Sequence, residues 1–300
     1  MSIRSVLVCG GTHGNELSGV YAVKHWQGAP NELANIAPTV DIQYLLVNEA
    51  SIEARTRYID EDFNRQFDTS RFRNNTQALK DGAVLNTEQA LAQRLYHSFG
   101  PDSDAQADLI IDIHNTTSSM GPTLIVLDND AFNRDLARYV KTHMPSANIL
   151  VEDHVPFNQH PYFCTLGKRG LMIEVGAQAQ GALRAKVYEQ SVEMAQHILA
   201  FVEQFNQQGA KALNFSPVQA FRLIEEVRYP QDIHGNRTAM IHENIDGNDF
   251  SALTTGDAAF TTFDGKEIKW EGETVYPHFI GEAAYDGLNI AFATASICEF

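Results

Sequence analysis

A histidine and a glutamate three positions apart, His13 and Glu16, follow a short apolar run and a Gly-Gly pair. Side chains at this spacing share one face of a helical turn, so both can converge on a single ion. A second histidine, His114, stands at the end of another apolar run, residues 108–115. Two histidines and one carboxylate are a ligand set of catalytic zinc, which keeps a further position for water. We therefore expect these three residues to hold one Zn²⁺ per subunit. The alternatives are a helix cap with a surface histidine, and a core histidine at position 114.

A proton carrier is expected beside such an ion. Glu174 lies in the otherwise apolar segment 171–175, where a charge without a task is costly. A carboxylate at that position can take a proton from water and pass it to a departing amine. Asp112 competes for this role, but its spacing to His114 is better suited to orienting the histidine ring. The alternative for Glu174 is a buried ion-pair partner.

Two arginines in the polar segment 55–65 are candidates for anion binding. Arg57 and Arg65 carry planar guanidinium groups, which suit a carboxylate or a developing oxyanion. Asn64 adds an amide that can contact the same anion. On composition alone these arginines could equally pair with the acidic residues 60–62 on a solvated loop.

Apolar runs that alternate with helical patterns are expected to position these residues. Strands are predicted at 6–8, 42–47, 108–115, 123–127, 148–152 and 171–176, and helices at 17–26, 86–99, 131–143 and 183–206. This alternation predicts an α/β fold with a mostly parallel or mixed sheet flanked by helices. The carboxyl ends of parallel strands meet at one edge of the sheet, which is where open α/β sheets place their sites.

The character of the sequence changes near residue 207. Beyond it we predict strands at 221–229, 238–244, 260–270 and 290–294, with a hairpin turn at Asp264-Gly265 and no convincing helix. We therefore expect a catalytic domain over residues 1–206 and a mainly β C-terminal domain over residues 207–300.

Composition narrows the class of protein. Of 300 residues, 44% are hydrophobic and 20% are charged, with a formal net charge of −16. An acidic surface disfavours nucleic-acid binding. The three cysteines are scattered, no signal peptide is recognisable, and no apolar run approaches the ~18 residues of a membrane span. We expect a cytoplasmic protein with neither a nucleic acid nor a membrane as partner.

Four segments in this order, 10–16, 57–65, 112–121 and 173–181, resemble the aspartoacylase/succinylglutamate desuccinylase family. This family is a branch of the zinc carboxypeptidase-like fold, and the resemblance implies that fold for residues 1–206. Residues 281–285 match more loosely. The four motifs taken together are specific, whereas any one alone would not be.

The resemblance also implies roles for individual residues. The two histidines and the glutamate of the expected metal site match the family's zinc ligands. Arg57 matches an arginine that polarises the scissile carbonyl, and Asn64 with Arg65 matches a pair that holds a substrate carboxylate. Glu174 matches the general base and acid. Tyr285 matches a tyrosine through which the C-terminal domain shapes the substrate pocket.

One segment departs from the family pattern. Residues 160–164 read His-Pro-Tyr-Phe-Cys, and Cys164 falls where a second arginine would bind the side-chain carboxylate of the substrate. Lys168 or Arg169 could substitute from the same loop. We therefore regard His160, Tyr162, Cys164 and Lys168 as further candidates for substrate binding.

The implied activity is hydrolysis of N-acyl-L-amino acids, first of all N-acetyl-L-aspartate to acetate and L-aspartate. The alternatives are an aminoacylase for other substrates, such as aromatic N-acyl amino acids, and a succinylglutamate desuccinylase. A non-enzymatic alternative is a zinc-containing protein that binds acidic metabolites. Analogy with the family makes a homodimer possible.

Overall fold

The computed structural model describes residues 2–80, 82–209 and 215–300. Its α-helices are α1 (Leu17–Gly28), α2 (Asn31–Ala34), α3 (Glu49–Ala54), α4 (Thr69–Lys80), α5 (Thr87–Phe99), α6 (Ala131–His143) and α7 (Ala185–Gln208). Short 3₁₀ helices span Phe63–Arg65, Phe157–Gln159, Phe163–Leu166 and Ala283–Leu288. None of the helices in these three described ranges is both long and apolar enough to cross a membrane.

Nine strands form one mixed sheet in the order β11-β12-β7-β5-β4-β6-β3-β1-β2. They are β1 (Ser5–Gly10), β2 (Asp41–Leu46), β3 (Leu109–Asn115), β4 (Gly121–Val126), β5 (Asn148–Val151), β6 (Gly170–Gly176), β7 (Gln219–Arg228), β11 (Tyr276–His278) and β12 (Ile290–Glu299). Five neighbouring pairs are parallel, and three are antiparallel: β4 with β6, β7 with β12, and β11 with β12. The predicted fold class, a mostly parallel sheet with helices, is confirmed.

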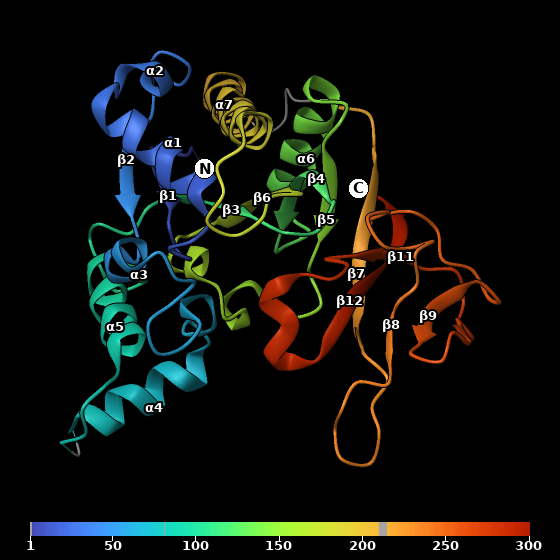
Figure 1. The fold of residues 1–300 in the computed structure, drawn as a ribbon. Coiled ribbons are helices and arrows are strands. Elements are labelled where there is room, and N and C mark those ends of the chain that lie inside the picture. The colour runs from blue at the N-terminus through green and yellow to red at the C-terminus, as the bar shows by residue number, and fades with distance from the viewer. Residues whose placement is uncertain (1, 81, 210–214) are drawn as a thin grey trace.

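Strands β1, β3 and β6 lie side by side and run in the same direction, so they end at the same edge of the sheet (Figure 1). Gly10 at the end of β1 pairs with Ile113, the residue before His114. His114 in turn pairs with Glu174 of β6. The register therefore brings three segments that are far apart in the sequence to one place.

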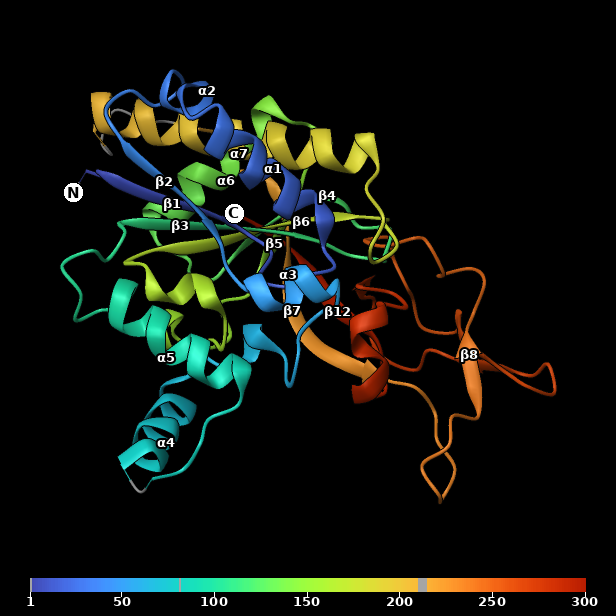
Figure 2. The same ribbon diagram turned by 60° about the vertical axis from the view of Figure 1, so that its left-hand side comes forward.

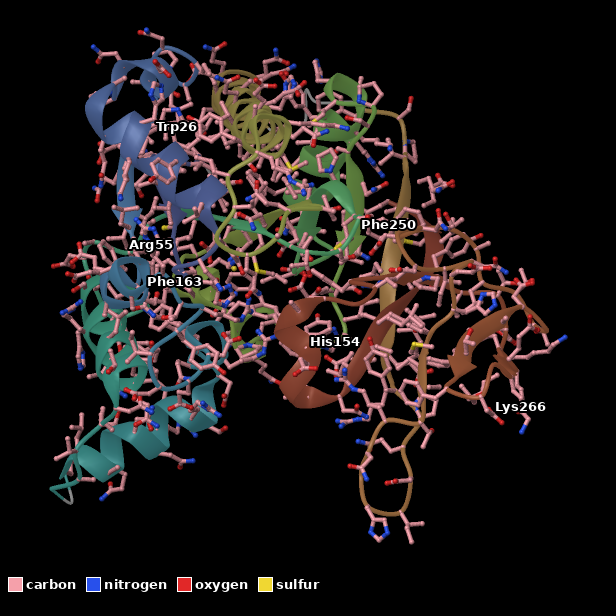
Figure 3. The ribbon with its side chains drawn as sticks, viewed as in Figure 1. Trp26, Arg55, His154, Phe163, Phe250 and Lys266 are labelled. Atoms are coloured by element: carbon pink, nitrogen blue, oxygen red, sulfur yellow. The ribbon has the colours of Figure 1, made fainter. Side chains whose placement is uncertain are left out.

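Helices cover both faces of this sheet (Figure 2). Alternate residues of β1 point to opposite faces, so Val6 and Val8 pack in one apolar cluster with α1, α6 and α7, while Leu7 packs in another with α5. Trp26 belongs to the first cluster and Phe163 to the second (Figure 3). Burial on both faces explains why Leu109, Ile110, Ile111 and Ile113 of β3 are apolar on both sides of the sheet.

Glycine lets α1 approach the sheet closely. A Cβ atom on Gly10 would lie 2.3 Å from the carbonyl oxygen of Gly19, and one on Gly19 would lie 2.3 Å from that of Ile113. Such distances are too short for any side chain. The start of α1, and with it Glu16, is therefore held directly over the ends of β1 and β3.

The strands of the C-terminal part of the chain belong to two different sheets. Strands β7, β12 and β11 continue the main sheet, whereas β8 (Ala239–Ile241), β9 (Ala258–Thr262) and β10 (Glu267–Lys269) form a small antiparallel sheet. The predicted hairpin turn at Asp264-Gly265 joins β9 to β10, with Gly265 at φ +84°. The division of the chain near residue 207 stays a prediction.

Candidate active site

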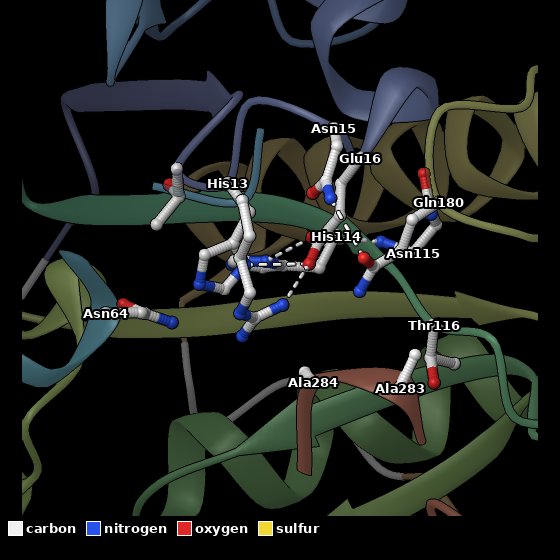
Figure 4. A network of polar contacts seen from close by, with 12 residues as sticks. His13, Asn15, Glu16, Asn64, His114, Asn115, Thr116, Gln180, Ala283 and Ala284 are labelled. Carbon is white, nitrogen blue, oxygen red and sulfur yellow. Dashed lines mark hydrogen bonds and ion pairs between the residues drawn. The ribbon is translucent and has the colours of Figure 1, made fainter. Parts of the chain in front are cut away.

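Three buried side chains at the ends of β1 and β3 converge on one point (Figure 4). Potential ligand atoms of His13, Glu16 and His114 all lie within 4.8 Å of one another. His13 Nδ1 lies 2.7 Å from Glu16 Oε1, and His114 Nδ1 lies 2.8 Å from Glu16 Oε2. The side chains are 3–5% exposed, which argues against a surface histidine.

The outer nitrogen of each histidine faces a second carboxylate. His114 Nε2 lies 2.8 Å from Asp112 Oδ2, and His13 Nε2 lies 3.1 Å from Asp62 Oδ1. Thr12 donates a hydrogen bond to Asp112 and so fixes that carboxylate in turn. Metal-binding histidines usually donate their second ring N–H to a carboxylate, which fixes the tautomer and the ring orientation. Both imidazoles therefore present Nδ1 to the common point.

The donor set fits a divalent metal ion. His13 Nδ1 is buried and makes no hydrogen bond with any of the described residues, although Glu16 Oε1 is only 2.7 Å away. Two acceptor atoms this close, without a hydrogen bond between them, suit a shared cation. Burial alone would raise the pKa of Glu16, but the neighbouring His13 and His114 outweigh it and hold that pKa well below its usual range. Glu16 precedes α1 without capping it through its side chain, so the helix-cap alternative does not hold.

Glu174 lies beside this point on β6 and lines the same cavity. Its Oε1 atom is buried and has no hydrogen-bond partner among the described residues. Burial, followed by the nearby Glu16 charge, raises the pKa of Glu174 well above its ordinary value. A carboxyl group whose pKa is raised in this way suits transfer of a proton in both directions. No salt bridge holds Glu174 within the described ranges, so the ion-pair alternative is not supported.

Arg57 is held at the edge of the metal site by two carboxylates. Its Nη1 lies 2.9 Å from Glu16 Oε1, and its Nη2 lies 3.1 Å from Asp62 Oδ2. Burial would raise the pKa of Asp62, but His13 and Arg57 lower it well below the usual range. Asp62 therefore links the arginine to the histidine ligand.

Asn64 and Arg65 lie on the 3₁₀ helix that follows Asp62. The Asp62 side chain caps the start of this helix by accepting a hydrogen bond from the Asn64 N–H. Asn64 and Arg65 both line an open cavity together with His13, Glu16, His114, Glu174, Tyr162 and Tyr285. The Arg65 guanidinium lies over the Tyr162 ring, 5.5 Å from its centroid. Within the described ranges Arg65 makes no ion pair with a carboxylate of the chain. It is therefore available to bind an anion.

The C-terminal part closes one side of this cavity. Glu282 accepts hydrogen bonds from the hydroxyl of Thr116 and from the backbone and hydroxyl of Thr117, directly after β3. Asp249 accepts in the same way from Ser118 and Ser119. These contacts place Tyr285 in the wall of the cavity, as the resemblance implies.

Four candidates of the segment 160–169 lie outside this cavity. Cys164 is fully buried in the apolar cluster below the sheet. Lys168 is exposed and pairs with Asp108 at 2.7 Å, and Arg169 pairs with Asp130. His160 stacks on Tyr162, with ring centroids 5.6 Å apart, but is not part of the lining. This placement corrects the expectation that Lys168 or Arg169 supplies a second cation to the pocket. Both residues precede Gly170, the first residue of β6, whereas the cavity lies at the carboxyl end of that strand.

Sequence reasoning missed three carboxylates of the site. The sequence indicates Asp62 only as a possible partner of the arginines, and Glu152 and Glu282 are not among the predicted site residues. Glu152 lies after β5, is fully buried by neighbouring atoms, and accepts a hydrogen bond from Tyr162 at 3.0 Å. A carboxylate directly after a buried strand, as at Glu152, is the signal that could have identified it.

Comparisons with known proteins agree with this geometry. Residues 2–202 match the sequence model of the succinylglutamate desuccinylase/aspartoacylase catalytic domain, and residues 216–297 match that of the AstE/AspA barrel-sandwich hybrid domain. An aspartoacylase of Xenopus tropicalis is 38% identical over 97% of this chain and 92% of its own length. An aspartoacylase of Mus musculus is 37% identical, with the same two coverages.

Relatives with a different named activity are nearly as similar. The human N-acyl-aromatic-L-amino acid amidohydrolase (carboxylate-forming) is 35% identical over 97% of this chain and 89% of its own length. The crystal structure of murine aminoacylase 3 superimposes with a TM-score of 0.87 at 30% identity, covering 100% of this chain and 97% of that one.

Proposed function

The chain belongs to the succinylglutamate desuccinylase/aspartoacylase family and is a metal-dependent amidohydrolase, and on this premise we propose how its residues deacylate N-acyl-L-amino acids. The observation that carries the proposal is the convergence of His13, Glu16 and His114 beside the unpartnered carboxyl group of Glu174. A non-enzymatic metal-binding protein would have no need of a proton carrier at that place.

His13, Glu16 and His114 would hold the metal ion, and zinc suits two imidazoles and one carboxylate. When bound, the ion supplies Lewis-acid polarisation to water and to the amide carbonyl. Glu174 takes the proton of the attacking water and then delivers it to the leaving nitrogen. The raised pKa of Glu174 supports the second of these steps, because the group must hold the proton until the C–N bond breaks.

The two arginines act on opposite ends of the substrate in this proposal. Arg57, already oriented by Glu16 and Asp62, donates to the oxygen on which negative charge develops. Arg65 and Asn64 hold the α-carboxylate, since Arg65 forms no ion pair with any carboxylate that the structure describes. This contact converts binding energy into orientation of the amide bond.

N-acetyl-L-aspartate is the first candidate substrate. It is supported by the names of several relatives at 34–38% identity, including aspartoacylases of frog, mouse and zebrafish. The products would be acetate and L-aspartate.

The charges of the cavity favour a second candidate, N-acyl amino acids with uncharged side chains. Two cationic residues line the cavity, and Arg57 is already neutralised by two carboxylates. Among the described residues that line the cavity, Arg65 is the arginine without a carboxylate partner, whereas N-acetyl-L-aspartate carries two carboxylates. Glu152 adds a further acidic group to the lining. The human relative at 35% identity is named for aromatic N-acyl amino acids.

The test is hydrolysis of a panel by the purified protein: N-acetyl-L-aspartate, N-acetyl-L-phenylalanine, N-acetyl-L-glutamine and N-succinyl-L-glutamate. The metal content of the same sample is measured, and the assay is repeated after chelation and after restoring zinc. We expect hydrolysis that chelation abolishes and zinc restores. A metal-loaded sample that hydrolyses none of the four would contradict the proposed function and favour a metabolite-binding protein.

A further inference from the structure

A buried carboxylate lies behind the segment that carries both arginines. Glu88, in the first turn of α5, is 0% exposed. Its Oε1 accepts hydrogen bonds from Asn48 Nδ2 at 3.1 Å and from the N–H of Ile59 at 2.7 Å. Its Oε2 accepts from the N–H groups of Asp60 at 2.9 Å and Glu61 at 3.3 Å. Four donors thus fill the acceptor capacity of one carboxylate.

No salt bridge with a described residue compensates this charge. None of the ion pairs found in residues 2–80, 82–209 and 215–300 includes Glu88. A buried carboxylate is tolerated without a cation when several N–H groups converge on it, and the start of a helix adds a favourable field. Three of the four donors are consecutive backbone amides, so the charge fixes the path of the main chain over Ile59–Glu61.

The held segment connects the parts of the active site. It runs from Arg57, two residues before Ile59, to Asp62, directly after Glu61, and then to Arg65. The fourth donor, Asn48, also donates its backbone N–H to the carbonyl of Gly11, close to His13. Glu88 therefore bridges the arginine segment and the start of the metal-binding turn.

Capping of α5 does not require Glu88. Asn86 and Gln89 form a reciprocal capping box at the helix start, each side chain bonding to the other residue's backbone. Asp60 returns the contact by accepting from the Thr87 N–H at 2.8 Å. The carboxylate of Glu88 is thus directed entirely at the segment 59–61 and Asn48.

We propose that Glu88 is a positioning residue of the active site, which acts by fixing the backbone of Ile59–Glu61 and thereby the guanidinium groups of Arg57 and Arg65. This inference rests on the proposed function for its kinetic consequences. Its structural part, the fixed path of the arginine segment, does not depend on which substrate is hydrolysed.

Glu88→Gln is the direct test, because it keeps the shape of the side chain but turns an NH₂ group toward N–H donors. We expect kcat/KM to fall by about 10- to 100-fold, since misplacement by about 1 Å has such an effect. KM should rise through Arg65 and kcat should fall through Arg57. Metal content should change far less than kcat/KM, because the proposed ligands His13, Glu16 and His114 lie on other segments.

The matched control is Gln93→Met on the same helix. Gln93 is also buried, at 6% exposed, and donates to Phe72 and Thr76 of α4 rather than to the arginine segment. It should lower thermal stability without changing kcat/KM by more than about twofold. A Glu88→Gln enzyme within twofold of wild type, or no worse than the Gln93→Met enzyme, would overturn the proposal.

Hydrogen–deuterium exchange supplies a readout that needs no activity. Glu88→Gln should accelerate exchange in the peptide covering residues 57–65 but not in one covering 109–115. Unchanged exchange at 57–65 would overturn the proposal even if activity were lost. If wild-type protein hydrolyses no N-acyl amino acid, the proposed function fails while this measurement still tests Glu88.

A milder variant covers the case in which Glu88→Gln does not fold. Asp60→Asn weakens the reciprocal contact with Thr87, and Asp60 is exposed, so the fold should persist. We expect the same acceleration of exchange at 57–65, with a smaller amplitude. Exchange identical to wild type would count against the bridge between α5 and the arginine segment.

Discussion

Glu174 is the residue whose replacement separates chemistry from metal binding. A glutamine in its place keeps the volume but cannot carry a proton, so we expect Glu174→Gln to lose roughly 10²–10⁴ in turnover. It is not one of the three ligands, and metal content should therefore be unchanged. Steady-state kinetics with metal analysis of the same sample checks both parts. Near-normal turnover in this variant would remove Glu174 from the mechanism.

Glu152 is expected to influence the choice of substrate side chain. Glu152→Gln leaves one acidic group fewer in the cavity. The kcat/KM for N-acetyl-L-aspartate should therefore rise relative to that for N-acetyl-L-phenylalanine. We expect a change on the order of tenfold in the ratio of the two kcat/KM values. Glu225→Gln, on the exposed part of β7, is the control and should leave the ratio unchanged. A ratio that stays constant in Glu152→Gln would place this carboxylate outside substrate selection.

At the level of single residues, the sequence predicts the clustering of His13, Glu16 and His114 that the structure shows. The His-x-x-Glu spacing after an apolar run, and a histidine ending another, are local signals with a geometric consequence. Asp62 gave no such signal, because it is one of three consecutive acidic residues in a segment without periodicity. Only the turn of the chain after Glu61 decides that this acid, and not its neighbours, meets His13 and Arg57.

Among the elements, the loop after β3 depends on the C-terminal part for its position. Asp249 accepts hydrogen bonds from the Ser118 hydroxyl and from the backbone N–H groups of Ser119 and Ile280. In Asp249→Asn an amide NH₂ would face these donors. We expect a loss of about 1–3 kcal/mol in the free energy of unfolding, measured by urea denaturation.

Asp232→Asn is the control for this prediction. Asp232 accepts from the backbone of His234 and Asn236 within one exposed turn of the same part of the chain. Its replacement should cost clearly less, since water can replace the lost contacts. Equal losses in the two variants would mean that Asp249 does no more than close a local turn.

The position of most helices and strands was predictable from the sequence, but the pairing of the strands in the sheets was not. The apolar runs identified β1, β3 and β6, and the long helical pattern identified α7 within two residues at each end. Periodicity is local, however, and could not show that β7 and β12 would extend the first sheet. It also missed the 12-residue helix α4, and the short helices α2 and α3 and the three-residue strand β11, whose patterns are too brief to read. Cys164 and Lys168 were misplaced for a related reason, because counting positions along a loop does not give the direction of its side chains.

On the scale of the whole molecule, buried neutral histidines tie stability to pH. Burial lowers the pKa of His278 from its ordinary value of 6.5 to about 4. Between these two pKa values the unfolded chain therefore binds more protons than the folded protein. The contribution of His278 to the free energy of unfolding is complete above pH 6.5 and decreases as the pH falls toward 4. The loss from this one group would be about 3 kcal/mol.

His278→Phe should reduce this decrease of the free energy of unfolding at acidic pH. The imidazole stacks on Phe250 with 5° between the rings, and its Nε2 is buried with no hydrogen-bond partner in the described part of the chain, so an apolar ring is tolerated there. Urea denaturation at intervals from pH 4 to 7 measures the slope. His25→Gln, at a half-exposed histidine paired with Glu32, is the control and should retain it. A His278→Phe protein with the wild-type slope would show that other groups govern acid stability.

The continuation of the main sheet through β7 limits how the molecule can be divided. Leu150 and Val151 of β5 pair with Phe221 and Arg222, and the last residue, Phe300, exchanges two backbone hydrogen bonds with Val218. A truncated protein ending after α7 would keep every proposed metal ligand. It would, however, lose β7, so β5 would become an edge strand with unpaired backbone groups. Such strands recruit other chains, so the shortened protein should precipitate or form large particles in light scattering rather than yield a minimal hydrolase.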